Sequence, residues 1–206
     1  MAVIVIGGHS RNVGKTSVVA GIIAALPHYR WTALKITQYG HGICSKDGET
    51  CHCATDDHNW AVSEEKDLTG TTDTSRFLQA GAAQVYWVRT QQGKLAEAMP
   101  TIRRKLAAAP NTIIESNSVI KFVRPDLYLT VLDPANADFK ASAQEFIDRA
   151  DAIILHHTHG QAAWQGVSLK PVTSRPVFNI QPPHYMTPEI LGFVQAELTL
   201  RGELRT

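Results

Sequence analysis

Short apolar runs rich in β-branched residues alternate along the chain with longer segments whose apolar positions recur at helical spacing. Residues 3–6 form the first run, a glycine-containing turn follows at 7–14, and residues 18–23 carry apolar side chains spaced as in a helix. The same patterns predict further strands at 31–37, 84–89, 112–115, 125–132, 152–156 and 177–180, and helices at 73–80, 94–109, 139–149 and 188–201. Strands that alternate with helices predict a three-layer α/β/α fold around a mostly parallel, doubly wound sheet.

One segment departs from this alternation. Residues 38–72 are polar, irregular and rich in glycine, aspartate, histidine and cysteine. A loop of that length in a compact domain is usually functional or disordered. We expect a single domain over residues 1–206, with an inserted Cys/His-rich loop at about 38–72. In such a sheet ligands bind outside the carboxyl ends of the strands, so motifs at strand ends carry the functional weight.

The composition narrows the class of protein. Hydrophobic residues make up 44% and charged residues 19% of the 206 positions, which fits a globular protein with a sizeable core. The net charge of +1 gives no electrostatic reason to expect binding to nucleic acid or to a membrane. No apolar run reaches the ~20 residues that span a bilayer, and the N-terminus lacks the positive region of a signal peptide. Three cysteines within ten positions are not a disulfide framework, and we expect a cytoplasmic protein.

The first turn carries the clearest chemical signal. Gly8 to Thr16 read G-H-S-R-N-V-G-K-T between a strand and a helix, as in phosphate-binding loops. Backbone N–H groups and the helix N-terminus would attract a polyphosphate, Lys15 would neutralise its β- and γ-phosphates, and the Thr16 hydroxyl would hold Mg²⁺. His9 stands where the usual spacing has glycine, so the loop is one residue longer. The residues expected to contact nucleotide are Gly8, His9, Asn12, Val13, Gly14, Lys15, Thr16 and Ser17. The alternative is a chance Gly-Lys-Thr in an ordinary strand–turn–helix.

Two acids are placed to complete a magnesium site with Thr16. Glu115 ends the apolar strand at 112–115, and Asp73 opens the helix after the irregular segment. Mg²⁺ prefers oxygen ligands, and phosphoryl transfer uses it to neutralise charge. Lys35, on the second predicted strand, would stabilise the transferring phosphoryl group or position the acceptor. Alternatively, Glu115 is a solvated strand-end acid and Asp73 a plain N-cap.

The segment Asp73–Ala82, DTSRFLQAGA, resembles the D-[ST]-x-R-x-x-x-A-G-A segment of the molybdopterin-guanine dinucleotide biosynthesis adaptor family (MobB). Lys35-Ile36-Thr37 and the His41-Gly42 beyond it resemble the second strand and loop of that family, and Glu115 falls at its strand-end acid. The length of the phosphate loop is instead similar to that of dethiobiotin synthetases. These enzymes share the lysine on the second strand and a metal-binding Asp and Glu at corresponding points.

Both families are P-loop proteins. The resemblance implies Mg²⁺-dependent binding of ATP or GTP, then hydrolysis or phosphoryl transfer in cofactor biosynthesis, with Lys15, Lys35 and Glu115 as the catalytic residues. It also allows a nucleotide-binding adaptor or metallochaperone with little turnover of its own. The acceptor would be a small molecule or a partner enzyme, and proteins of this class often pair as homodimers across the phosphate loop.

The sequence does not decide whether the base of the nucleotide is guanine or adenine. Residues 156–159 read HHTH where GTPases of the class carry Asn-Lys-x-Asp, which speaks against a standard guanine site. Asn179 comes three residues before Pro182-Pro183 and resembles the adenine-contacting asparagine of dethiobiotin synthetases. The same asparagine is equally explained by turn chemistry.

The irregular segment holds a cluster of cysteine and histidine residues. Cys44, Cys51, Cys53 and His58 give the spacing C-x6-C-x-C-x4-H, and three thiolates with one imidazole are a ligand set for structural zinc. His52 is a rival fourth ligand, and three thiolates could also hold an iron–sulfur cluster. Bound metal would stiffen the loop or be carried as cargo; otherwise the loop is reduced and metal-free.

Overall fold

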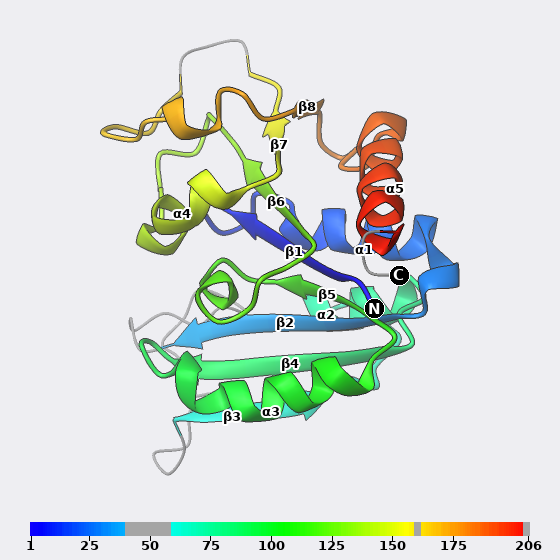
Figure 1. The fold of residues 1–206 in the computed structure, drawn as a ribbon. Helices are drawn as coiled ribbons and strands as arrows, with labels where there is room; N and C mark the ends of the chain where they lie inside the picture. The colour runs from blue at the N-terminus through cyan, green and yellow to red at the C-terminus, as the bar shows by residue number, and fades with distance from the viewer. Residues whose placement is uncertain (40–58, 159–161, 204–206) are drawn as a thin grey trace.

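The computed structural model describes residues 1–39, 59–158 and 162–203, and in it helices cover both faces of one central sheet (Figure 1). The strands are β1 (Val3–Gly8), β2 (Trp31–Tyr39), β3 (Trp60–Glu64), β4 (Gln84–Gln91), β5 (Asn111–Glu115), β6 (Leu127–Leu132), β7 (Ala152–His156) and β8 (Val177–Ile180). The helices are α1 (Lys15–Ala25), α2 (Asp73–Gln79), α3 (Leu95–Ala108), α4 (Ala141–Phe146) and α5 (Pro188–Glu203). Short 3₁₀ helices are η1 (Pro27–Tyr29), η2 (Ser118–Lys121), η3 (Ile147–Arg149) and η4 (Lys170–Val172).

The described strands form one eight-stranded sheet in the order β3-β4-β2-β5-β1-β6-β7-β8. Neighbouring strands are parallel except β3 and β4, which are antiparallel. The predicted three-layer fold with a mostly parallel, doubly wound sheet is confirmed. The expectation that residues 38–72 are irregular throughout is wrong, because β2 runs on to Tyr39 and residues 60–64 form the edge strand β3. Trp60 and Val62 pack on the apolar layer of α3, a contact that local sequence does not reveal.

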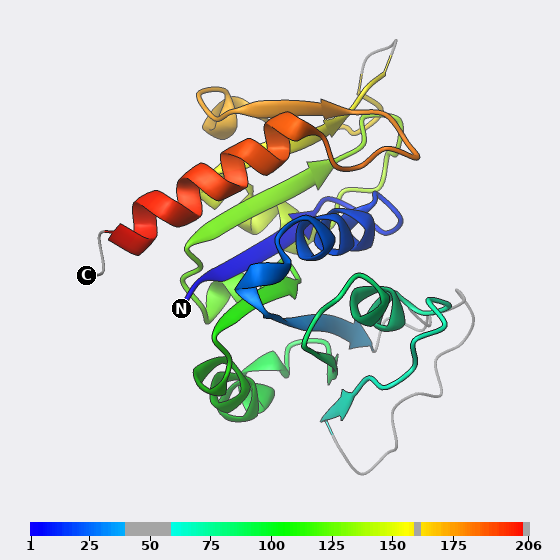
Figure 2. The same cartoon turned by 90° about the vertical axis from the view of Figure 1, so that its right-hand side faces the viewer.

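The two faces of the sheet bury separate apolar layers. Along β1, Ile4 and Ile6 pack with α1, α2 and α5, whereas Val3 and Val5 pack with α3 and α4. Figure 2 shows the sheet from the side of α1, α2 and α5. Alternate residues of a strand point to opposite faces, and a strand covered on both faces is apolar throughout. Because these four side chains are buried, β1 fixes the point where the loop after it emerges.

Two helices differ from the expected ranges. The helix expected at 94–109 is α3, and it continues through Pro100. Pro100 is exposed, so water can satisfy the carbonyl that loses its helical partner. The helix expected at 139–149 begins only at Ala141 and ends in η3, which leaves Phe139 and Lys140 in the segment that joins β6 to α4. None of the helices in the described ranges combines the length and the apolar character needed to cross a membrane.

Candidate functional site

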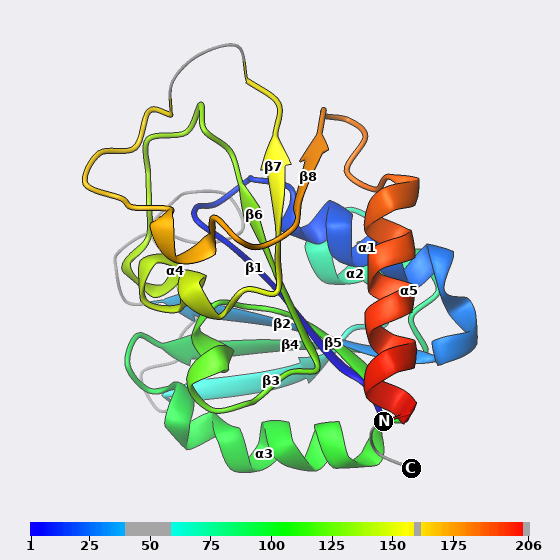
Figure 3. The same ribbon diagram turned by 45° about the horizontal axis from the view of Figure 1, so that its top comes forward.

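The loop after β1 (residues 8–16, the phosphate loop) brings the start of α1 to the carboxyl edge of the sheet, near the ends of β6 and β7 (Figure 3). Gly14 is the N-cap of α1 with a left-handed φ of 90°, no side chain of the described residues caps the helix, and its first turn holds no acid. The Val18 N–H donates to the Gly14 carbonyl at 3.0 Å, so the N–H groups of Lys15, Thr16 and Ser17 lack helical partners. An uncapped helix start of this kind attracts anions.

Two residues that the sequence analysis did not assign to the phosphate site hold the second half of the phosphate loop. A Cβ on Gly14 would lie 2.0 Å from Cε1 of Tyr185, which follows β8. His156, at the end of β7, donates from Nε2 to the Val13 carbonyl at 2.9 Å. The rings of His156 and Tyr185 meet edge-on, with centroids 5.8 Å apart. These contacts explain why glycine is required at position 14 and why Val13 is buried.

Asn117, which was also missed, holds the first half of the loop. Its Oδ1 accepts from the Gly8 N–H and its Nδ2 donates to the Gly8 carbonyl, both at 2.8 Å, so the amide acts as a strand partner. The His9 N–H donates to the Val131 carbonyl at 3.2 Å and prolongs the pairing of β1 with β6. The backbone N–H groups of Gly8 and His9 are therefore hydrogen-bonded within the protein and are not available to a phosphate. The only sequence signal for Asn117 is its place two residues after the strand-end Glu115.

The His9 side chain is fully buried and ties the loop to the segment that joins β6 to α4. Its Nε2 accepts from the Asp133 N–H at 2.9 Å, and its Nδ1 donates to the Asp138 carbonyl at 2.7 Å. Because an N–H only donates and a carbonyl only accepts, the ring is neutral with its proton on Nδ1. The rings of Phe139 and Trp164 lie against it, with centroids 5.1 and 5.2 Å away. Burial lowers the pKa of His9, so the imidazole keeps the neutral form that these two hydrogen bonds require.

We expect His9 to make the protein less stable as the pH falls below about 6.5. Its pKa is lowered in the folded protein, so the unfolded chain takes up the proton first and gains stability relative to the folded chain. The thermal unfolding midpoint should therefore drop more between pH 7.5 and 5.5 in the wild type than in His9→Gln. The exposed His28 supplies a control, since His28→Gln should keep the wild-type drop. Equal drops in the wild type and His9→Gln would contradict this role.

Lys15, the first residue of α1, reaches back across the phosphate loop. Its Nζ donates to the Ser10 carbonyl at 2.5 Å, and a Cβ on Gly8 would come within 3.0 Å of its Cδ. Burial lowers the pKa of Lys15, and the charge of Glu115 opposes that effect. Asn12, in the same loop, is exposed and has a φ of 56°. Lys15 thus places a partly buried cation inside the loop, next to the unpaired N–H groups of α1.

Four side chains predicted from separate segments form one hydrogen-bonded group, called here the acid–lysine cluster: Thr16, Lys35, Asp73 and Glu115. Lys35 and Glu115 are neighbours across the parallel pair β2–β5. Lys35 Nζ donates to Glu115 Oε1 at 2.8 Å and also pairs with Asp73 Oδ2. Thr16 Oγ1 donates to Glu115 Oε2 at 2.8 Å. The side chains of Glu115 and Lys35 are 6% and 14% exposed, against 43% for Asp73, so the cluster opens to solvent on the Asp73 side.

Opposite charges within the acid–lysine cluster keep Lys35 and Asp73 in their charged forms. Burial acts to lower the pKa of Lys35, but the carboxylates of Glu115 and Asp73 outweigh it and raise the pKa. Burial acts to raise the pKa of Asp73, but the charge of Lys35 and its hydrogen bond outweigh it and lower the pKa. Lys35 therefore stays protonated and Asp73 ionised at neutral pH.

Thr72, rather than Asp73, is the N-cap of α2. The Ser75 N–H donates to Thr72 Oγ1 at 3.1 Å, and the Thr72 N–H donates to Ser75 Oγ at 2.8 Å. The alternative that Asp73 is a plain N-cap is wrong, and its carboxylate is available to the acid–lysine cluster. One turn further along, Arg76 Nη2 donates to Ser17 Oγ at 3.0 Å and ties α2 to α1.

The oxygen atoms of the cluster match the ligand preference of Mg²⁺. Thr16 Oγ1 and the carboxylates of Asp73 and Glu115 are hard donors grouped beside the start of α1. Within the described ranges, no group of three or more His, Cys, Asp or Glu side chains is placed to hold a metal ion. A magnesium ion here would thus take its remaining ligands from phosphate oxygens and water, as is usual for this ion.

The remaining predicted ligands are not among the residues of the acid–lysine cluster that the structure describes. The predicted zinc ligands fall outside the described residues: Cys44, Cys51, Cys53 and His58. Asn179 is exposed in the edge strand β8 and, with Thr187 and Glu189, lines a cavity of about 170 Å³. Because β6 and β7 separate β8 from β1, Asn179 is not part of the acid–lysine cluster.

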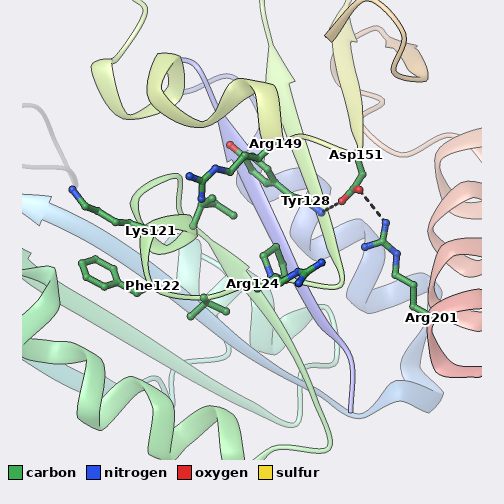
Figure 4. A pocket seen from close by; sticks show the side chains of 10 residues that line it. Lys121, Phe122, Arg124, Tyr128, Arg149, Asp151 and Arg201 are labelled. Atoms are coloured by element: carbon green, nitrogen blue, oxygen red, sulfur yellow. Dashed lines mark hydrogen bonds and ion pairs between the residues drawn. The ribbon is translucent and has the colours of Figure 1, made fainter. Parts of the chain in front are cut away.

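A larger cavity, of about 540 Å³, lies at the opposite edge of the sheet, where β6 and β7 begin. In Figure 4 the guanidinium of Arg201 points to Asp151, which it contacts at 2.9 Å, while the ammonium of Lys121 points away from that pair. Asp151 Oδ2 also accepts from the Tyr128 N–H at 2.8 Å. These charged groups join α5 to the start of β6 and do not converge on one point.

Comparisons with known proteins add distant likenesses only. No protein-family model matches the chain, and no curated protein matches it. LpxK from Aquifex aeolicus in complex with ATP is 17% identical over 87% of this chain and 53% of LpxK, with a TM-score of 0.48, so the chain spans about half of LpxK. HypB from Helicobacter pylori in complex with nickel is 12% identical over 98% of this chain and 87% of HypB, with a TM-score of 0.46. MobB from Bacillus subtilis is 15% identical over 94% of this chain and 96% of MobB, with a TM-score of 0.40.

The class of the protein follows from its own fold and loop. P-loop NTPases have a doubly wound, mostly parallel sheet with a glycine loop between the first strand and the first helix, and this chain has both. They also place a lysine and a threonine at the start of that helix and an acid on the neighbouring strand, as Lys15, Thr16 and Glu115 are placed here. The general resemblance seen in the sequence is confirmed at this level. At identities of 12–17%, the solved structures do not extend it to a particular activity.

Proposed function

We propose that the chain binds Mg²⁺ with ATP or GTP and hydrolyses the nucleotide or transfers its terminal phosphoryl group, as a MobB-like protein of cofactor biosynthesis. The observation that carries this proposal is the 2.8 Å hydrogen bond from Thr16 to Glu115 directly beside the uncapped start of α1. It joins the expected phosphate site to the expected metal site. A helix start with only a structural role would be capped, and it would gain nothing from a lysine bound between two acids.

Each residue of the site has a defined part in this proposal. Lys15 and the unpaired N–H groups of α1 bind the phosphates. Thr16, Asp73 and Glu115 would hold Mg²⁺, which when bound neutralises charge on the β- and γ-phosphate oxygens. Lys35 is directed by its two carboxylates to stabilise the terminal phosphate or to position the acceptor. Catalysis would then consist of positioning and charge stabilisation.

A second candidate function is a nucleotide-binding adaptor or metallochaperone with little turnover of its own. It is favoured by the contacts of the two acids: Glu115 accepts from Thr16 and Lys35, and Asp73 is paired with Lys35. These contacts occupy both oxygens of Glu115 and one oxygen of Asp73, which favours a structural or metal-holding part for the two acids over general-base catalysis. In this proposal a partner enzyme receives the nucleotide-dependent signal or the metal.

The proposal keeps four expectations drawn from the sequence: domain organisation, location in the cell, pairing and zinc binding. The chain would be one domain over residues 1–206, act in the cytoplasm, and pair as a homodimer across the phosphate loop. The inserted segment would bind zinc, stably if the site is structural and exchangeably if the metal is cargo. The proposed zinc ligands are Cys44, Cys51, Cys53 and His58. Zinc that survives dialysis and is lost in Cys51→Ser would identify a structural site.

Calorimetric titration of the full chain with Mg·ATP and Mg·GTP, followed by a phosphate-release assay, tests the proposal. We expect one of the two nucleotides to bind with a dissociation constant between about 1 μM and 1 mM, in the range usual for enzyme substrates, and more weakly when EDTA removes Mg²⁺. Binding with steady phosphate release supports an enzyme, and binding with little release supports an adaptor. Failure of both nucleotides to bind would overturn both functions.

A further inference from the structure

Lys140 lies beside the phosphate loop, although no motif marks it. It follows β6 on the segment that joins β6 to α4, and its backbone N–H donates to the His9 carbonyl at 2.8 Å. Two more hydrogen bonds fix this segment: His9 Nδ1 donates to the Asp138 carbonyl at 2.7 Å, and Ser10 Oγ donates to Asp138 Oδ2 at 2.5 Å. Backbone and side-chain contacts therefore hold the Cα of Lys140 at a defined place next to the loop.

The Lys140 side chain is half-buried, and among the described residues its ammonium has no hydrogen-bond or ion-pair partner. Removing a charge from water without a partner costs free energy. Among the described residues, the charges that act on it most strongly are the cations Lys15 and Arg11, followed by the carboxylate of Asp138 and the cation Lys35. Burial, followed by repulsion from Lys15 and Arg11, lowers the pKa of Lys140 to about 8. A lysine with only a structural role would gain from a partner or from full exposure, and Lys140 has neither.

The order of the strands places Lys35 and Lys140 on either side of the phosphate loop, where both could contact one bound anion. Lys35 comes from β2 on one side of β1, and Lys140 follows β6 on the other side. Lys35 is already bound by two carboxylates, whereas Lys140 is not. A terminal phosphate group carries about two negative charges and accepts several strong hydrogen bonds. An anion bound at the loop would relieve the repulsion among Lys140, Lys15 and Arg11.

We propose that Lys140 is a phosphate-binding residue that contacts the terminal phosphate of a bound nucleoside triphosphate, so that the site prefers triphosphate over diphosphate. The inference rests on the proposed function and adds one residue to the site. Lys140 gains its partner only when the nucleotide is bound. The stability that the protein gives up by burying an unpaired cation is then recovered as binding free energy.

The test compares the wild type with Lys140→Met, which keeps an unbranched apolar stem of four atoms and removes the ammonium. Calorimetric titrations with Mg·ATP and Mg·ADP, and with the guanine pair, give the preference for triphosphate. We expect this preference to fall about tenfold in Lys140→Met, the loss that follows when one charged hydrogen bond is removed. Lys140→Arg should retain the preference, and Lys121→Met, an exposed lysine at the opposite edge of the sheet, should leave it unchanged.

Two further readouts separate binding from a structural role. Without nucleotide, the unfolding midpoint of Lys140→Met should rise, because repulsion from Lys15 and Arg11 is removed. In the wild type the preference for triphosphate should weaken as the pH rises from 7.5 to 9, because Lys140 loses the proton that makes it a cation, and in Lys140→Met it should not. An unchanged preference in Lys140→Met, while the wild type binds both nucleotides, would overturn this inference and leave the proposed function standing. If the wild type binds neither nucleotide, the proposed function fails first and this inference fails with it.

Discussion

Lys15→Ala should weaken the binding of Mg·ATP and Mg·GTP by a factor of about 100 or more and reduce phosphate release to the background rate. Lys15 is the cation held inside the phosphate loop, with its Nζ 2.5 Å from the Ser10 carbonyl. Its removal leaves the backbone N–H groups of α1 to meet the phosphates alone. Charge-assisted hydrogen bonds in a partly buried site are the strong ones, so this single change should exceed any other in the loop. Calorimetric titration and the phosphate-release assay measure it.

Stability separates this effect from misfolding. Burial opposes the charged form of Lys15, so we expect Lys15→Ala to unfold at a temperature no lower than the wild type. Lys94→Ala is a matched control, since the Lys94 ammonium pairs with Glu97 at 2.9 Å and both side chains are more than 40% exposed. It should leave both binding and stability nearly unchanged. Wild-type phosphate release by a folded Lys15→Ala would contradict the assignment of the loop.

The sequence predicts the parts of this site that are close together in the chain or lie at strand ends. Lys15 and Thr16 follow directly from the loop pattern. Lys35 and Glu115 could be placed together because the carboxyl ends of parallel strands meet at one edge, and the structure pairs them across β2 and β5. In such cases the sequence predicts that the residues lie at the same edge of the sheet, and the strand order of the folded protein then brings them into contact.

The parts that could not be predicted depend on side chains brought together only by the folded sheet. Gly8 looks like a phosphate-contacting glycine, yet its N–H and carbonyl are bound by Asn117, which lies 109 positions later. Lys140 acquires its position from hydrogen bonds to His9 and by the packing of the β6–α4 segment. Neither Asn117 nor Lys140 belongs to a local motif, so periodicity and spacing carry no signal for them.

Lys35→Met should destabilise the protein by about 3 kcal/mol at neutral pH, the loss typical when one partner of a buried ion pair is removed. Glu115 is 6% exposed, and of its side-chain partners among the described residues it would keep the hydroxyl of Thr16. Asp73 would face it across the same space without the ammonium that now binds both carboxylates. Lys94→Met again supplies the control, because its exposed ion pair should contribute less than about 1 kcal/mol. Denaturant unfolding monitored by circular dichroism gives both values.

Magnesium distinguishes a metal site from an ordinary buried ion pair in this variant. Lys35→Met retains all three oxygen donors of Thr16, Asp73 and Glu115, and it removes the cation that competes with a metal for the two carboxylates. Any ligand that binds only the folded state raises its stability. Millimolar Mg²⁺ should therefore raise the unfolding midpoint of Lys35→Met clearly more than that of the wild type or Lys94→Met. An equal shift in all three proteins would mean that the two carboxylates are structural partners of Lys35 and do not hold a metal.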